Sequence, residues 1–118
     1  MNKIEKVRVS GDTKLIDVYE LLDETDHRLL LVADDDEFIG VVSIGDLQRS
    51  ILKCVSLEIP VKDIIRPDII FASEKDSTDK IKKEMLKFRM EFMPIVSSLG
   101  KIIDVVFEGI NFCKIVFI

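Results

Sequence analysis

The stretch Arg28–Leu47, RLLLVADDDEFIGVVSIGDL, contains two apolar runs separated by an acidic turn. The runs are Leu29–Val32 and Phe38–Ile44, and the turn between them is Asp34–Glu37. Short runs rich in aliphatic and β-branched residues on either side of turn-forming residues are typical of two strands in a hairpin. The sequence therefore predicts a hairpin here, followed by a helix that begins at Asp46.

The end of the second predicted strand brings together a small residue, a hydroxyl and a carboxylate. Gly40 has no Cβ, so another group can approach its backbone closely. Ser43 offers a hydroxyl, and Asp46 offers a carboxylate where a helix N-cap is expected. Both polar side chains also have a purely structural interpretation, in which Asp46 only caps the helix and Ser43 only satisfies backbone groups.

The segment Gly40–Asp46, GVVSIGD, resembles the ligand motif of the cystathionine-beta-synthase (CBS) domain. Together with the preceding His27–Val32, HRLLLV, it is similar to an adenylate-binding segment in the gamma subunit of AMP-activated protein kinase. The resemblance extends over residues 7–109. It implies a tandem pair of β-α-β-β-α CBS motifs, known as a Bateman module, with ligand clefts between the two halves.

An internal repeat agrees with this resemblance. A shift of 64 positions lays the first half on the second without a gap, so that Leu22 meets Leu86. A half this small cannot bury much core alone, whereas two halves that face each other across their sheets can. The expected fold class is α/β (α+β) with pseudo-twofold symmetry, the first CBS motif being residues 1–59 and the second residues 60–118.

Helical spacing and turn-forming residues predict the remaining elements. The first helix should run from Leu15 to about Asp26, with Asp12 or Thr13 as its N-cap. The other expected elements are a strand at Lys6–Ser10, a short helix after Pro60, a strand at Ile69–Ala72, a helix capped by Asp76–Thr78 with the apolar face Ile81, Met85 and Phe88, and a second hairpin of Phe92–Val96 and Ile102–Phe107.

The two halves differ chemically. At the positions that match the first-half motif, the second half carries Asp104, Phe107 and Ile110. The glycine, the hydroxyl and the carboxylate are all lost, so at most one well-formed site is expected. The tail Ile110–Ile118, INFCKIVFI, stands where the last helix belongs, although its Val, Ile and Phe residues favour a strand. We expect this tail to pack against a partner chain or a following domain.

The chemistry of a nucleotide suggests a role for each candidate residue. The Asp46 carboxylate can accept hydrogen bonds from both ribose hydroxyls, and the Ser43 hydroxyl can donate to a phosphate. Arg28, and His27 if protonated, are cations within reach of the phosphate. The resemblance implies that the base packs among aliphatic side chains. By position in the family, the remaining contacts would come from Val41, Ile65, Arg66, Met90 and Glu91.

Several of these residues keep a structural alternative. His27 can simply be solvated in a polar turn. Arg28 can form a surface ion pair of little energetic value. Met90 can belong to the core, and the Glu91 carboxylate near the phosphate position can disfavour highly charged ligands.

Composition and charge argue against several other functions. The 118-residue chain has a net charge of −5 and no basic stripe, so nucleic acid is not an expected partner. Neither a membrane-spanning run nor a signal peptide is visible, so no membrane contact and a cytoplasmic location are expected. With one histidine, no zinc-ligand spacing and no Gly-rich phosphate loop, neither a metal site nor enzyme activity is expected. Cys54 and Cys113 are expected to be small buried residues.

The sequence thus predicts a regulatory module that binds an adenosine nucleotide of the AMP, ADP or ATP class, AMP foremost, and requires no other cofactor. The residues Leu52–Val61, LKCVSLEIPV, resemble CBS pairs placed ahead of sugar-phosphate nucleotidyltransferase domains, so a catalytic domain on the C-terminal side is an expected partner. A homodimer through the CBS helices is expected as well. The alternative is a structural dimerisation module that binds no ligand.

Overall fold

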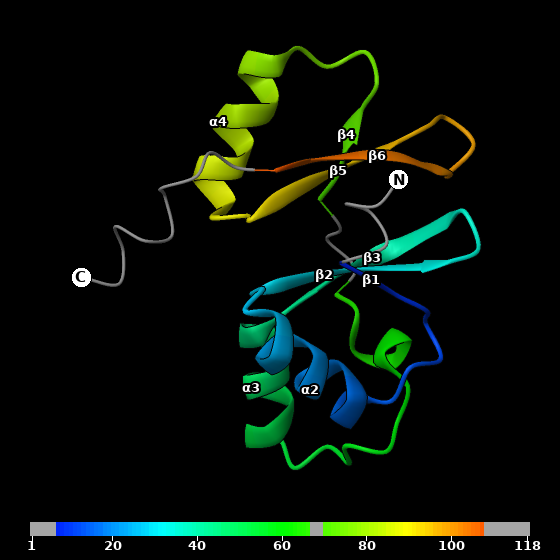
Figure 1. Ribbon diagram of the computed structural model, residues 1–118, viewed down its shortest axis with the longest axis vertical. Helices are drawn as coiled ribbons and strands as arrows, with labels where there is room; N and C mark the ends of the chain where they lie inside the picture. Colours follow the sequence, from blue (N-terminus) through cyan, green and yellow to red (C-terminus); the bar gives the residue numbers. More distant parts are fainter. Residues whose placement is uncertain (1–6, 67–69, 108–118) are drawn as a thin grey trace.

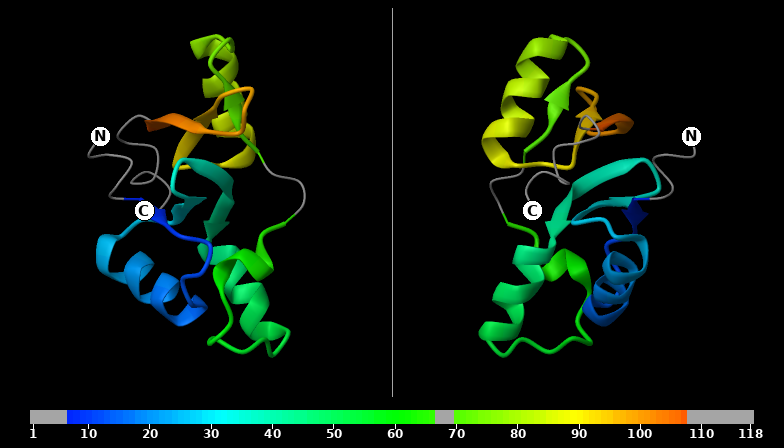
Figure 2. Two further views of the ribbon diagram at one scale, coloured as in Figure 1. Left: turned by 90° about the vertical axis from the view of Figure 1, so that its right-hand side faces the viewer. Right: turned by 60° about the vertical axis from the view of Figure 1, so that its left-hand side comes forward.

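The chain is arranged in four layers, with two sheets between outer helices (Figure 1). A computed structural model describes residues 7–66 and 70–107. Helices α2 (Leu15–Thr25) and α3 (Ile44–Leu52) lie on the outer side of one sheet, and α4 (Thr78–Phe88) lies on the outer side of the other. Figure 2 shows the same order of layers from two further directions.

Both sheets have the same topology, a short parallel strand beside an antiparallel hairpin. The strands are β1 (Arg8–Val9), β2 (Leu29–Asp34) and β3 (Glu37–Ser43) in the first sheet, and β4 (Ala72–Ser73), β5 (Phe92–Val96) and β6 (Ile102–Phe107) in the second. Both predicted hairpins are confirmed, as is the α/β fold built from two similar halves. β4 begins only at Ala72, and Ile69 of the strand predicted there lies outside the described residues.

The core lies between each sheet and its helices. The central strands β2 and β5 are buried along almost their whole length, which explains their near-continuous apolar sequences. Helix α4 buries Ile81 and Met85 as predicted. The prediction for Phe88 is wrong, because this last helical residue is 44% exposed and its ring lies 5.3 Å from the Lys87 ammonium.

The repeat is not gapless. Leu22 is buried on α2, and its buried counterpart on α4 is Met85, which lies 63 positions later, whereas Leu86 is 53% exposed. The left-handed residue that ends each helix follows the same spacing, Asp26 in the first half and Arg89 in the second. From the hairpin turn onward the spacing is 64 residues, because the turn of the second hairpin contains one more residue.

The tips of the two hairpins join the halves. The Phe38 amide donates to the Gly100 carbonyl at 2.9 Å, and the Ile102 amide donates to the Asp36 carbonyl at 2.7 Å. Phe38 and Ile102 are equivalent in the repeat, as are Asp36 and Gly100, so each bond is the image of the other. This reciprocal pair confirms the predicted pseudo-twofold relationship.

The connector between the halves, of which the structure describes residues 53–66, caps α2. The Leu15 and Ile16 amides each donate at 3.0 Å to backbone carbonyls of the connector, those of Ile59 and Leu57. The N-cap residue is Lys14, which makes no side-chain capping bond, so the predicted cap at Asp12 or Thr13 is wrong. The reason is that the connector already satisfies amides that a cap would serve.

Three smaller predictions have mixed outcomes. The helix after Pro60 is present as a 3₁₀ turn at Val61–Ile64, and Ser77 caps α4 as expected, accepting from the Lys80 amide at 3.1 Å. Cys54 is exposed rather than buried, because it follows α3 in a left-handed conformation with φ 59°. Cys113 and the tail Ile110–Ile118 lie outside the described residues.

Two substitutions on α4 test the corrected spacing. We expect Met85→Ala to lower the free energy of unfolding by about 2–5 kcal/mol, because it removes a fully buried side chain and leaves a cavity. Leu86→Ala is the matched control and should change it by only about 0.5 kcal/mol. Urea denaturation measures both. Equal losses for the two variants would contradict the 63-residue spacing.

Candidate functional site

Ser43 and Asp46 form a capping box at the start of α3. Ser43 is the N-cap, and its hydroxyl accepts from the Asp46 amide at 3.2 Å. Asp46 Oδ2 accepts in return from the Ser43 amide at 2.8 Å and from the Ser43 hydroxyl at 3.0 Å. The prediction that Asp46 is itself the N-cap is therefore wrong by three residues. The box leaves the Asp46 side chain 8% exposed and fixed in direction.

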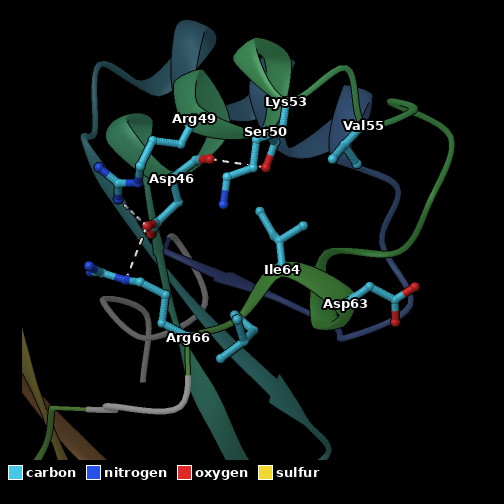
Figure 3. A pocket seen from close by; sticks show the side chains of 9 residues that line it. Asp46, Arg49, Ser50, Lys53, Val55, Asp63, Ile64 and Arg66 are labelled. Atoms are coloured by element: carbon cyan, nitrogen blue, oxygen red, sulfur yellow. Dashed lines mark hydrogen bonds and ion pairs between the residues drawn. The ribbon is translucent and has the colours of Figure 1, made fainter.

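The second oxygen of this carboxylate faces two arginines (Figure 3). Asp46 Oδ1 lies 2.6 Å from Arg49 Nη2 and 3.3 Å from Arg66 Nε. Arg49 comes from the next turn of α3, and Arg66 from the chain that follows the 3₁₀ turn. Both arginine side chains are more than half exposed, at 53% and 57%, so they can leave the carboxylate without unfolding their surroundings.

A cavity of about 360 Å³ opens beside this group of charges. Its apolar wall consists of Val55, Ile64 and Ile65, and its polar residues include Lys53 and Ser50. Figure 3 shows α3 on one side and the connector on the other. The cavity therefore offers a carboxylate, cations and aliphatic surface within one space.

Gly40 explains how the connector reaches this place. A Cβ on Gly40 would lie only 2.7 Å from Cγ2 of Ile65, so the glycine is needed for the connector to lie against β3. The predicted close approach at Gly40 is confirmed, and the approaching group is the Ile65 side chain. The Arg66 side chain follows directly and reaches Asp46.

A second cavity, of about 700 Å³, lies between the two halves. The first half contributes the start of β2 and the junction of β3 with α3, and the second half contributes the junction of α4 with β5. Three arginines line it, Arg28, Arg49 and Arg89, so the cavity has a cationic wall. Its other lining residues are Leu29, Ser43, Ile44, Gly45, Gln48, Met90 and Glu91.

Glu91 crosses from the second half to the first. Its Oε1 accepts from the Arg28 amide at 2.8 Å and from the Leu29 amide at 3.2 Å. Its Oε2 accepts from Nδ1 of His27. His27 is only 25% exposed in its side chain, so its interpretation as a solvated turn residue is wrong. The sequence did not reveal the partner, because Glu91 is 64 residues away.

The structure brings most of the ten candidate residues together. Asp46, Ile65 and Arg66 line the first cavity, while Arg28, Ser43, Met90 and Glu91 line the second. Met90 is also 6% exposed, so its core interpretation is confirmed. Gly40, Val41 and His27 line neither of these two cavities.

The sequence analysis missed three cations, Arg49, Lys53 and Arg89. Arg49 was detectable, because a residue three positions after Asp46 lies on the same helix face. Arg89 precedes the candidate Met90 but faces the cavity only because it ends α4 in a left-handed conformation.

Within residues 7–66 and 70–107, no three metal-binding side chains converge. Over the same part of the chain, every helix is too short or too polar to cross a membrane.

Comparison with known proteins relates the first half of the chain, and the fold of the pair, to CBS domains. The family profile of the CBS domain matches residues 1–53. A protein with CBS domains from Burkholderia ambifaria MC40-6 is 26% identical and superposes with a TM-score of 0.67, over 85% of this chain and 74% of that one. CBSX2 in complex with AMP is 23% identical, with a TM-score of 0.71 over 96% and 89% of the chains. The fold is thus that of a CBS pair.

Two further relatives broaden the comparison. A CBS domain protein from Pyrobaculum aerophilum, complexed with AMP, is 18% identical with a TM-score of 0.68, over 86% of this chain and 79% of that one. A curated relative, homoserine O-acetyltransferase from Methanobrevibacter ruminantium, is 29% identical over 90 residues. The match covers 76% of this chain and only 17% of the acetyltransferase.

Two glycines at the site give a matched test of the connector. We expect Gly40→Ala to destabilise the fold by about 1–3 kcal/mol, because the new Cβ would collide with Ile65. Gly45→Ala should be neutral or stabilising, because the nearest atom is 3.5 Å away and alanine favours the helix. Thermal unfolding of both variants measures the difference. A neutral Gly40→Ala would show that Ile65 does not pack on β3.

Proposed function

We propose that this module binds AMP or a closely related adenosine nucleotide beside Asp46 and regulates an attached or partner domain. The observation that carries the proposal is the Asp46 carboxylate. One of its oxygens is fixed by the capping box, and the other faces a cavity through two displaceable arginines. A carboxylate held in this way can accept from both hydroxyls of a ribose once the arginines move.

The two cavities suggest the orientation of the ligand. The 360 Å³ cavity has the aliphatic wall of Ile64 and Ile65, against which the flat face of a base can pack. The 700 Å³ cavity has Ser43 and three arginines, which suit a phosphate. Arg49 lines both cavities, and Asp46 lines the first beside it. A ribose bound at Asp46 would therefore lie between a base in the first cavity and a phosphate in the second.

Similar structures make AMP the first ligand to test. CBSX2 and the Pyrobaculum aerophilum protein were both determined with AMP, and both share the fold of this chain. CbpB, with a TM-score of 0.73, was determined with c-di-AMP, another adenine nucleotide. We therefore propose the ten candidate residues as the binding region, with Asp46 as the ribose anchor, and add Arg49 and Arg89 to them.

A regulatory signal would travel through the connector. Ile65 packs on Gly40 and Arg66 pairs with Asp46, so a ligand that replaces Arg66 would release the chain that leads to the second half. We propose residues 1–59 and 60–118 as the two motifs that this connector couples. A ligand that binds one arrangement of the halves more tightly than another would shift the equilibrium toward that arrangement. The difference in binding free energy is what the attached domain would sense.

The regulated domain is a further part of the proposal. The sequence suggests a sugar-phosphate nucleotidyltransferase, whereas the matched curated protein is a homoserine O-acetyltransferase covered over only 17% of its length. In either case the module would sense the ligand, and the chemistry would occur in the other domain. The module alone is then expected to turn over no nucleotide.

Calorimetric titration with AMP tests the binding proposal. We expect the parent chain to bind AMP, and Asp46→Asn to weaken binding at least about tenfold, the effect of losing roughly 1.4 kcal/mol of interaction. Asparagine can still accept from the Ser43 amide, so helix α3 keeps part of its cap.

Asp79→Asn is the control, because it removes an exposed carboxylate from α4 in the other half and should leave AMP affinity unchanged. A parent chain that is folded yet binds no AMP, or an Asp46→Asn variant that binds as well as the parent, would refute the proposed site.

A second candidate function, dimerisation, is favoured by exposed apolar residues on α3. Leu52 is 81% exposed and Ile51 is 44% exposed, although both are large and apolar. We propose that a second copy covers them, as expected for a CBS pair that dimerises through its helices.

Light scattering after size exclusion measures the oligomeric state. We expect a dimer, and we expect Leu52→Lys to shift it toward monomer. Leu99→Lys is a close control, because Leu99 is also 81% exposed but lies in the turn of the second hairpin rather than on a helix. A monomeric parent, or equal dissociation by both variants, would contradict helix-mediated dimerisation.

A further inference from the structure

We propose that Glu91 is a built-in anion that occupies part of the phosphate end of the cleft and makes the site select AMP over ADP and ATP. The inference rests on the proposed function, since it assigns the selectivity of the same site. One carboxylate, the groups that hold it and the arginines that line the same cavity carry the proposal.

The Glu91 carboxylate is bound as an anionic ligand would be. It accepts hydrogen bonds from two successive backbone amides, those of Arg28 and Leu29, and contacts the ring of His27. Successive amides of this kind form an anion-binding concavity. The side chain is 19% exposed, so it fills this concavity from within the protein.

A phosphate would have to compete with this arrangement. Displacing Glu91 would break bonds of 2.8 and 3.2 Å to the amides and the contact with His27. Bonds to an ionised carboxylate are among the stronger hydrogen bonds in proteins. A phosphate placed beside Glu91 without displacing it would meet a like charge, which disfavours both.

The repeat places side chains of opposite charge at equivalent positions of the two halves. Arg28 and Glu91 are equivalent positions, 63 residues apart, and the backbone of one contacts the side chain of the other. The first half therefore presents a cation where the second presents an anion. A symmetric site with a cation from each half would suit a polyphosphate better than this one does.

The cations of the cavity lie on the side of Asp46 and Ser43 as well as beside Glu91. Arg28, Arg49 and Arg89 line the same cavity, and Arg49 already serves Asp46. A ribose at Asp46 would put the α-phosphate near Ser43 and these arginines. The β- and γ-phosphates would extend further along the cavity that Glu91 lines, and each adds negative charge.

Titrations of the parent chain with AMP, ADP and ATP, without divalent cations, test the inference directly. We expect affinity to fall with each added phosphate, so that ATP binds at least about tenfold more weakly than AMP, a factor that corresponds to roughly 1.4 kcal/mol. All three titrations use the parent chain, so the result does not depend on whether a substituted chain folds.

Glu91→Gln then assigns the effect to one residue. Glutamine keeps an acceptor for the two amides and removes the charge, so the ratio of ATP to AMP affinity should rise about tenfold. Glu74→Gln removes an exposed carboxylate of the second half and should leave that ratio unchanged.

The outcomes separate this inference from the proposed function. AMP binding with equal ATP affinity in the parent, or with a ratio that Glu91→Gln does not change, overturns the role of Glu91 and leaves the nucleotide site standing. Binding of no nucleotide by parent and variant overturns both. ATP binding that appears only in Glu91→Gln supports Glu91 as the group that excludes it.

Discussion

The contact of the Glu91 carboxylate with the start of β2 is the interaction on which the arrangement of the cleft depends. It joins the junction of α4 and β5 to the amides of Arg28 and Leu29, while the reciprocal bonds between the hairpin tips join the opposite end of the sheets. The halves are therefore in contact at both ends of their sheets. The cavity between them is therefore a property of the pair and of neither half alone.

The connector adds a second constraint, because it serves both stability and the site. Its carbonyls cap α2, its Ile65 side chain packs on Gly40, and its Arg66 pairs with Asp46. The same segment that completes the first half thus also places Arg66 on the carboxylate that we propose as the ribose anchor. A ligand at Asp46 would act on this segment first, which gives a physical basis for regulation.

Local pattern predicted the hairpins, the helices and the junction at Gly40, Ser43 and Asp46, because alternation, helical spacing and capping act over a few residues. Local pattern failed where the interacting residues are far apart in the sequence. The cap of α2 comes from the connector, and His27 is paired with Glu91. Because the second hairpin turn contains one extra residue, the buried equivalent of Leu22 is Met85 and not Leu86. Arg66 was placed near the site only through family resemblance, and the sequence offered no sign of its ion pair.

The central claim is that an adenosine nucleotide takes the place of the arginines at Asp46, and the structure of the chain determined with AMP bound tests it most directly. The account predicts both ribose hydroxyls within hydrogen-bond distance of the Asp46 carboxylate, the Arg66 guanidinium withdrawn from it, and a single phosphate beside Arg28 with Glu91 still on the β2 amides. AMP bound elsewhere, or an Asp46–Arg66 pair that is unchanged beside the bound nucleotide, would contradict it.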